Sequence, residues 1–244
     1  MATEQQRLPA AWNRLWSRPI GWVLDHVLYR TSVTGKNNIP AAGPVIFAAN
    51  HISFLDGPVM FGAAPRPMHI MVKKEMFEGF LGKVLTASGQ IPVDRSGDRA
   101  ALHLGKQLLD AGRCVGILPE GTRGTGAAES ISSGVAWLAV NSGATVIPVA
   151  ILGTRHGGEH RDHIPQLRRK LYVSFGEPLT VQRRKGEPGR VSMDRAAAAI
   201  RDALAGHVQD SVRKTGQALP REAAPEPDQQ HRHIEVAGTP ADHH

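Results

Sequence analysis

The chain contains 244 residues, 41% of them hydrophobic, so it is long and apolar enough for one α/β domain or two small ones with a sizeable core. Its formal net charge of +7 predicts an anionic partner, such as nucleic acid, a membrane surface or a phosphorylated substrate. Aromatic residues make up 5% and no run alternates them with basic residues, which argues against a surface that stacks single-stranded nucleic acid. The one cysteine, Cys114, excludes an intrachain disulfide and a multi-cysteine zinc site.

The N-terminal residues 8–30 have the periodicity of a helix. Apolar residues recur there at intervals of three and four, and Pro19 and Gly21 are expected to kink or split the helix. Two interpretations stay open: the helix packs on the core of the protein, or it lies in a membrane interface with Trp and Leu in the lipid. No secretory signal is visible. A helix that spans a membrane needs about 18 uncharged apolar residues in a row, and no stretch is that long.

From Val33 onward, short apolar runs alternate with helical patterns. This alternation predicts an α/β fold in which helices flank a mostly parallel sheet. The chain after residue 214 is rich in Pro, Glu, Gln and His, so we expect residues 215–244 to form a disordered tail. The expected strands are 45–49, 68–72, 90–93, 114–118, 146–152 and 171–175, and the expected helices are 57–62, 80–87, 99–111, 134–141 and 193–214.

The stretch NHISFLDG directly follows a predicted buried strand and places His51 five positions before Asp56. A histidine on such a loop can act as a general base, and an aspartate bound to its other ring nitrogen would fix the tautomer. The two side chains can converge if the intervening residues form a turn. The spacing alone is equally typical of a helix-initiating turn with a satisfied histidine.

Ser53 lies between the two residues but lacks the G-x-S-x-G elbow that presents the nucleophile of many hydrolases. We therefore interpret it as a capping or loop hydroxyl. The attacking hydroxyl would then belong to a substrate, and the reaction would be group transfer rather than hydrolysis. A second stretch, LPEGTR, also follows a predicted strand, and ligands collect beyond the carboxyl ends of parallel strands.

Four blocks in order resemble those of the glycerolipid acyltransferases, specifically the 1-acylglycerol-3-phosphate (lysophosphatidate) acyltransferases. The resemblance extends from about Thr34 to Pro178. It departs from the family pattern after Arg123, where the lysine of a later Phe-Lys-x-Gly run is absent. The blocks are NHISFLDG at 50–57, GQIPVDR at 89–95, LPEGTR at 118–123 and VIPVA at 146–150.

The resemblance implies an O-acyltransferase in which His51 deprotonates a glycerol hydroxyl and Asp56 orients His51. Arg123 and Arg95 would bind the acceptor phosphate, because a guanidinium can donate two bonds to phosphate oxygens. The full set of residues implied to contact that phosphate is Glu120, Gly121, Thr122, Arg123 and Arg95.

The expected reaction moves a fatty acyl group from acyl-CoA or acyl carrier protein to lysophosphatidate, giving phosphatidate, with no metal and no other cofactor. The expected partners are those substrates and a membrane surface with anionic lipids, reached peripherally from the cytoplasmic face, and not nucleic acid. Residues 1–32 would form the amphipathic, membrane-contacting segment and residues 33–214 the acyltransferase domain.

Several alternatives remain open at this level. The acceptor could be another lysophospholipid or glycerol-3-phosphate, although enzymes acting on the latter more often show His-Arg-Ser where this chain has His51-Ile52-Ser53. A non-catalytic binder of anionic lipid and a lipid esterase are further alternatives. Two basic triplets, residues 168–170 and 183–185, could contact lipid headgroups or lie in solvated loops.

Overall fold

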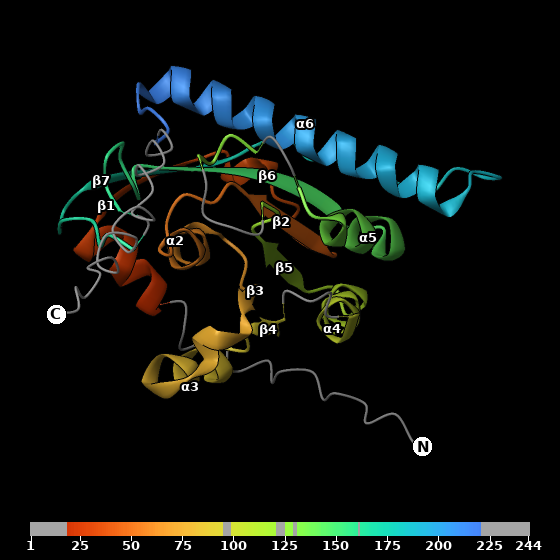
Figure 1. Cartoon of the computed structure of the whole chain (residues 1–244), viewed down its shortest axis with the longest axis horizontal. Coiled ribbons are helices and arrows are strands. Elements are labelled where there is room, and N and C mark those ends of the chain that lie inside the picture. The colour runs from red at the N-terminus through yellow and green to blue at the C-terminus, as the bar shows by residue number, and fades with distance from the viewer. Residues whose placement is uncertain (1–18, 95–98, 121–124, 129–130, 161, 221–244) are drawn as a thin grey trace, which may run out of the picture.

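The computed structural model describes residues 19–94, 99–120, 125–128, 131–160 and 162–220. Within them, seven strands form one sheet in the order β1-β7-β6-β2-β5-β3-β4, as Figure 1 shows. All neighbouring strands are parallel except β6 and β7, which are antiparallel. The strands are β1 (Arg30–Thr34), β2 (Val45–Ala49), β3 (Met68–Lys73), β4 (Ile91–Val93), β5 (Cys114–Ile117), β6 (Thr145–Leu152) and β7 (Lys170–Phe175).

The central strand β2 shows why the sheet is buried on both faces. All five of its residues are apolar and buried, and successive side chains point to opposite sides of the sheet. Phe47 packs with Met60 and Phe175 in the core on one side. Ile46 and Ala48 pack with Leu108 on the other side. A strand enclosed in this way holds the residues that follow it in a fixed position.

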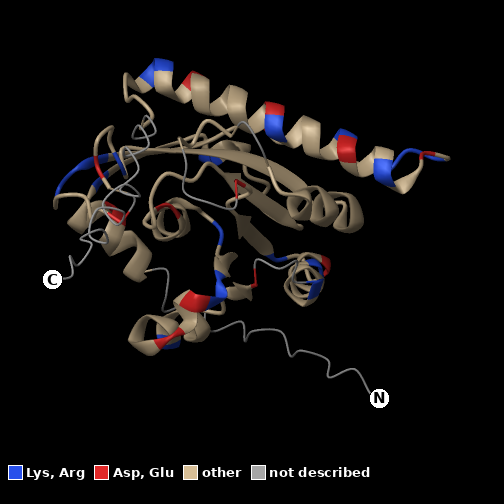
Figure 2. Cartoon of the chain, viewed as in Figure 1, with Lys and Arg blue, Asp and Glu red and all other residues tan. Residues whose placement is uncertain are grey.

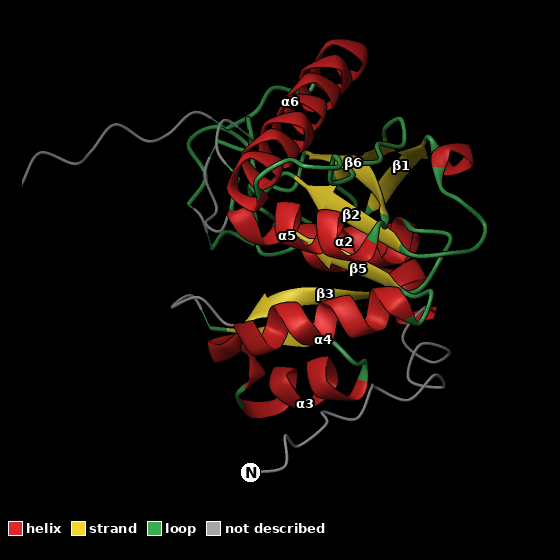
Figure 3. Ribbon diagram, turned by 90° about the vertical axis from the view of Figure 1, so that its right-hand side faces the viewer, coloured by secondary structure: helices red, strands yellow, loops and turns green. Residues whose placement is uncertain are grey.

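Helices cover both faces of the sheet (Figure 3). The helix α2 supplies apolar residues to the first core, whereas α4, α5 and α6 supply them to the second. Glycine in the left-handed conformation follows the last residue of α5 and of α6. The helices are α2 (Asp56–Ala63), α3 (Gly79–Ala87), α4 (Arg99–Asp110), α5 (Ser133–Ser142) and α6 (Gly189–Thr215), with shorter helices η1 (Leu24–Leu28), η2 (Lys36–Asn38) and η3 (Lys74–Phe77).

The predicted fold class is confirmed, and each predicted strand and helix after residue 44 is present with its ends moved by at most a few residues. The strand β1 was not predicted. It lies partly within the segment expected to be helical, and its residues pair with β7, with Val33 opposite Val173. Because β1 is an edge strand whose residues alternate between exposed and half-buried, it carries no continuous apolar run.

The N-terminal helical segment is described from residue 19. Residues 19–23 are helical and continue into η1, a short π-helix. Residues 8–18, about half of the predicted N-terminal helix, and residues 221–244, most of the predicted tail, lie outside the described residues. Across the described ranges, every helix is too short or too polar to cross a bilayer.

Candidate active site

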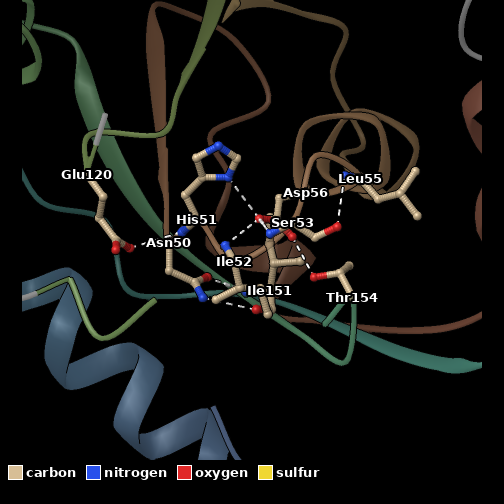
Figure 4. Close-up of polar contacts among 9 residues, drawn as sticks. All are labelled: Asn50, His51, Ile52, Ser53, Leu55, Asp56, Glu120, Ile151 and Thr154. Carbon is tan, nitrogen blue, oxygen red and sulfur yellow. Dashed lines mark hydrogen bonds and ion pairs between the residues drawn. The ribbon is translucent and has the colours of Figure 1, made fainter. Parts of the chain in front are cut away.

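The candidate site lies where three neighbouring strands end. Asn50 and His51 follow β2, Glu120 follows β5, and Thr154 follows β6. Since β2 runs parallel to both β5 and β6, the residues after these strands meet at one edge of the sheet. Figure 4 shows the side chains of Glu120 and Thr154 directed toward the turn formed by residues 50–56.

The fully buried side chain of Asn50 fixes the start of this turn. Its Nδ2 donates to the carbonyl of Ile151 at 3.0 Å, and its Oδ1 accepts the Ile151 N–H at 2.7 Å. The amide thereby extends the pairing of β2 with β6 beyond the last residue of β2. Breaking these two bonds would leave a buried amide oxygen and a buried amide N–H without partners, which is costly. The pairing therefore holds the backbone at His51 in place.

Asp56, at the first position of α2, is fully buried and is the centre of the hydrogen-bond network. Its Oδ2 accepts the N–H groups of Ile52 and Ser53, each at 2.7 Å, and lies 3.0 Å from His51 Nδ1. Its Oδ1 accepts the hydroxyl proton of Thr154 at 2.6 Å. These four contacts hold the buried carboxylate in one orientation toward His51.

These contacts determine the tautomer of His51. Because Oδ2 of Asp56 already accepts two backbone N–H groups, it faces His51 as an acceptor, so Nδ1 carries the proton. The lone pair of the neutral ring then lies on Nε2, which points away from the other labelled residues in Figure 4. The His51 side chain keeps 20% of its surface exposed, whereas Asp56 has none. This arrangement presents a base to the outside with a buried orienting carboxylate behind it.

Ser53 is fully buried, and its Oγ accepts the N–H of Leu55 at 3.3 Å. It is thus a loop hydroxyl, as predicted, within the turn that leads into α2. Among the described contacts Ser53 has no bond to His51, so Ser53 is not placed as its nucleophile.

Glu120 contacts the backbone of the turn rather than pointing into solvent. Its Oε1 accepts the N–H of His51 at 3.0 Å (Figure 4). Burial raises the pKa of this carboxyl, and the hydrogen bond from the His51 N–H partly offsets that rise. The resemblance implies that Glu120 contacts the acceptor phosphate. The described geometry shows a positioning contact of this carboxylate with His51, and its contact with phosphate stays a prediction.

Gly126 also packs against the same turn. A Cβ at this residue would lie 2.2 Å from Ile52 and 2.9 Å from Asn50, and its φ of +74° favours glycine as well. The implied phosphate ligands Gly121, Thr122, Arg123 and Arg95 lie outside the described residues, so their role remains a prediction. Thr154 and the amide of Asn50 were not assigned roles from the sequence. The position of Thr154, two residues after a predicted buried strand, was the only signal for it in the sequence.

Comparison with known proteins identifies the family of this chain. A family model described as Acyltransferase matches residues 30–152. A 1-acyl-sn-glycerol-3-phosphate acyltransferase of Bacillus subtilis is 31% identical over 150 residues, which is 60% of this chain and 72% of that protein. A protein of the same name from Borreliella burgdorferi is 31% identical over 129 residues, covering 51% of this chain and 52% of the relative. The crystal structure of the Thermotoga maritima 1-acyl-sn-glycerophosphate (LPA) acyltransferase PlsC shares the fold, with a TM-score of 0.62 at 22% identity over 81% of this chain and 78% of that one.

The chain therefore belongs to the acyltransferase family. Within that family it groups with the 1-acyl-sn-glycerol-3-phosphate acyltransferases, and it is accordingly an O-acyltransferase. The predicted family is confirmed.

Proposed function

We propose that this chain transfers a fatty acyl group from a thioester, either acyl-CoA or acyl carrier protein, to the free hydroxyl of 1-acylglycerol-3-phosphate, giving phosphatidate. The observation that carries the proposal is the hydrogen bond of 3.0 Å between His51 Nδ1 and Asp56, which leaves Nε2 as a free base. The names of the curated relatives support the choice of acceptor.

In this mechanism, Nε2 of His51 takes the proton of the acceptor hydroxyl as its oxygen attacks the thioester carbonyl. Asp56 stabilises the imidazolium that forms, because its carboxylate accepts a hydrogen bond from Nδ1–H throughout the reaction. Collapse of the tetrahedral intermediate breaks the carbon–sulfur bond, and the imidazolium returns its proton from Nε2 to the leaving thiolate. The sum is one ester formed and one thiol released, with His51 regenerated.

The acceptor phosphate would be bound by Arg123 and Arg95. Support for this comes from the position of Glu120 and Gly126, which lie on either side of residues 121–124 and both contact the turn at His51. A guanidinium can bind phosphate with two hydrogen bonds. The enzyme would work peripherally on the cytoplasmic face of a membrane, where its net charge of +7 favours anionic lipid.

The test is thiol release from acyl-CoA with lysophosphatidate, glycerol-3-phosphate and lysophosphatidylcholine as separate acceptors. We expect lysophosphatidate to give the highest kcat/KM and His51→Ala to lower kcat by about 100-fold or more, the size of a general-base contribution. The matched control is His103→Ala, which removes an exposed histidine on α4 and should leave the rate unchanged. Equal turnover in both variants would overturn the mechanism. Binding of anionic lipid with no thiol release would favour a non-catalytic binder.

A further inference from the structure

Residues 19–28 have a buried side and an exposed apolar side. The inner side is buried against α2, where Gly21 and Gly62 approach so closely that a Cβ on Gly21 would lie 2.8 Å from the Cα of Gly62. The outer side carries Ile20, Val23 and Val27 at spacings of three and four, with 57%, 42% and 49% of their surfaces exposed. Packing on the core explains the inner side only.

A loop far away in the sequence lies beside this segment. The N–H of Arg168 donates to the carbonyl of Leu28 at 2.7 Å, and the Tyr29 hydroxyl donates to the carbonyl of Pro165 at 3.3 Å. Of the residues around these anchors, Ile164 is 66% exposed and Leu167, which lies between them, is 70% exposed. Two large aliphatic side chains are thus held in solvent next to an apolar helix face.

The loop is fixed rather than loosely attached. Arg169 donates two hydrogen bonds to the Glu159 carboxylate, at 2.8 and 2.6 Å, and this ion pair lowers the pKa of Glu159 to about 2. Arg168 adopts a left-handed conformation with φ of 66°, which is uncommon for a residue other than glycine. The exposed position of Leu167 is therefore set by the structure on both sides of it.

Exposed apolar residues are concentrated at this place. Among the described residues, eleven large hydrophobic side chains are exposed, and seven of them lie in residues 19–28 or in this loop. Clustering of this kind marks an interaction surface, whereas single exposed apolar residues are ordinary. The seven are Ile20, Trp22, Val23, Val27, Leu28, Ile164 and Leu167.

Positive charge borders the cluster. Arg30, Arg168 and Lys170 are exposed, and the N–H of Arg30 donates to the carbonyl of Arg169, so the basic residues of β1 and of the loop lie side by side. Figure 2 shows Lys and Arg gathered at the β1 and β7 end of the sheet. Aliphatic side chains and a tryptophan bordered by cations fit the interface of an anionic bilayer, where apolar groups enter the lipid and cations meet the headgroups.

We propose that Ile164 and Leu167 form a second lipid-contacting element, which inserts beside residues 19–28 into the interfacial region of an anionic membrane. The inference deepens the proposed function, because it rests on an acceptor that resides in a membrane. It also assigns Arg168 and Lys170, the two exposed members of the basic triplet at 168–170, to headgroup contact. The face formed by residues 19–28 and this loop would then hold the enzyme on the membrane that contains its acceptor.

The test compares the double variant Ile164→Asp/Leu167→Asp with the control Val191→Asp, which changes an exposed apolar residue at the far end of α6 (Figure 1). Binding of the whole chain is measured by co-sedimentation with phosphatidylcholine vesicles that contain about one-third phosphatidylglycerol, and with pure phosphatidylcholine vesicles. We expect the double variant to bind the anionic vesicles at least about 10-fold more weakly, and the control to bind like the parent. The parent should prefer the anionic vesicles.

Two further measurements keep the outcomes separate. Thermal unfolding should show equal midpoints, and thiol release with a short-chain, freely soluble lysophosphatidate should be unchanged in the double variant. Unchanged vesicle binding would overturn the proposal, as would light scattering that shows these residues joining two copies of the chain. If the parent turns over no acceptor, the proposed function fails while the vesicle comparison still decides the role of the loop.

Discussion

Thr154 is buried behind Asp56, so a substitution there tests the positioning of the Asp56–His51 pair without changing a residue that faces the substrate. Its hydroxyl donates to Oδ1 of Asp56 at 2.6 Å, and both residues are fully buried. Thr154→Val keeps nearly the same volume and removes only the donor. The hydrogen bonds of Oδ2 with Ile52, Ser53 and His51 are left in place.

A hydrogen bond to a charged group contributes about 1.5–3 kcal/mol, so Thr154→Val should lower the free energy of unfolding by about that amount. We expect kcat to fall about 10-fold, because Asp56 is less firmly oriented, while KM for both substrates stays unchanged. Full kinetics and urea unfolding measure the two effects. Thr154→Ser, which restores the donor, should recover most of kcat.

The matched control is Thr86→Val, since Thr86 is an exposed threonine whose hydroxyl bonds a carbonyl within α3. It should change neither kcat nor stability by more than a small amount. If Thr154→Val and Thr86→Val behave alike, or if Thr154→Val loses stability with no change in kcat, Thr154 does not position the Asp56–His51 pair and the reasoning is refuted.

Two other changes have definite expected outcomes. Asp25 is fully buried on η1, and burial raises the pKa of its carboxyl from 3.8 to about 7. The protonated carboxyl favours the folded state. Its contribution to stability is therefore greatest below about pH 4 and is lost as the pH rises toward 7. The free energy of unfolding of Asp25→Asn should therefore exceed that of the parent by an amount that grows between pH 4 and 7 to at most about 4 kcal/mol. Urea unfolding at several pH values measures this difference. A difference that does not vary with pH would contradict the prediction. Arg123→Ala should raise KM for lysophosphatidate about 10-fold or more with little change in KM for acyl-CoA, because one charge-assisted phosphate contact is lost. An unchanged acceptor KM would show that the phosphate is bound elsewhere.

The sheet was predictable because its inner strands are short, continuous apolar runs such as residues 45–49. The strand β1 was not, since an edge strand with alternating exposure has no such run. The pairing of His51 with Asp56 was suggested by their place after a strand, but the sequence could not show that residues 52 and 53 donate to the same carboxylate.

The long-range contacts of the site could not be predicted from the sequence. Thr154 is 98 residues from Asp56, and only the parallel pairing of β2 with β6 brings the two together. Glu120 binds a backbone N–H, which every residue except proline possesses, so no side-chain pattern could identify its partner as His51.

The most direct test of the central claim is the rate at which phosphatidate forms from lysophosphatidate and acyl-CoA in Asp56→Asn. The amide has nearly the shape of the carboxylate, but it carries no charge to orient Nδ1–H and to stabilise the imidazolium of His51. We expect a fall in kcat of about 1,000-fold with little change in either KM. A variant that forms phosphatidate at the parent rate would contradict the assignment of His51 and Asp56 as base and orienting residue.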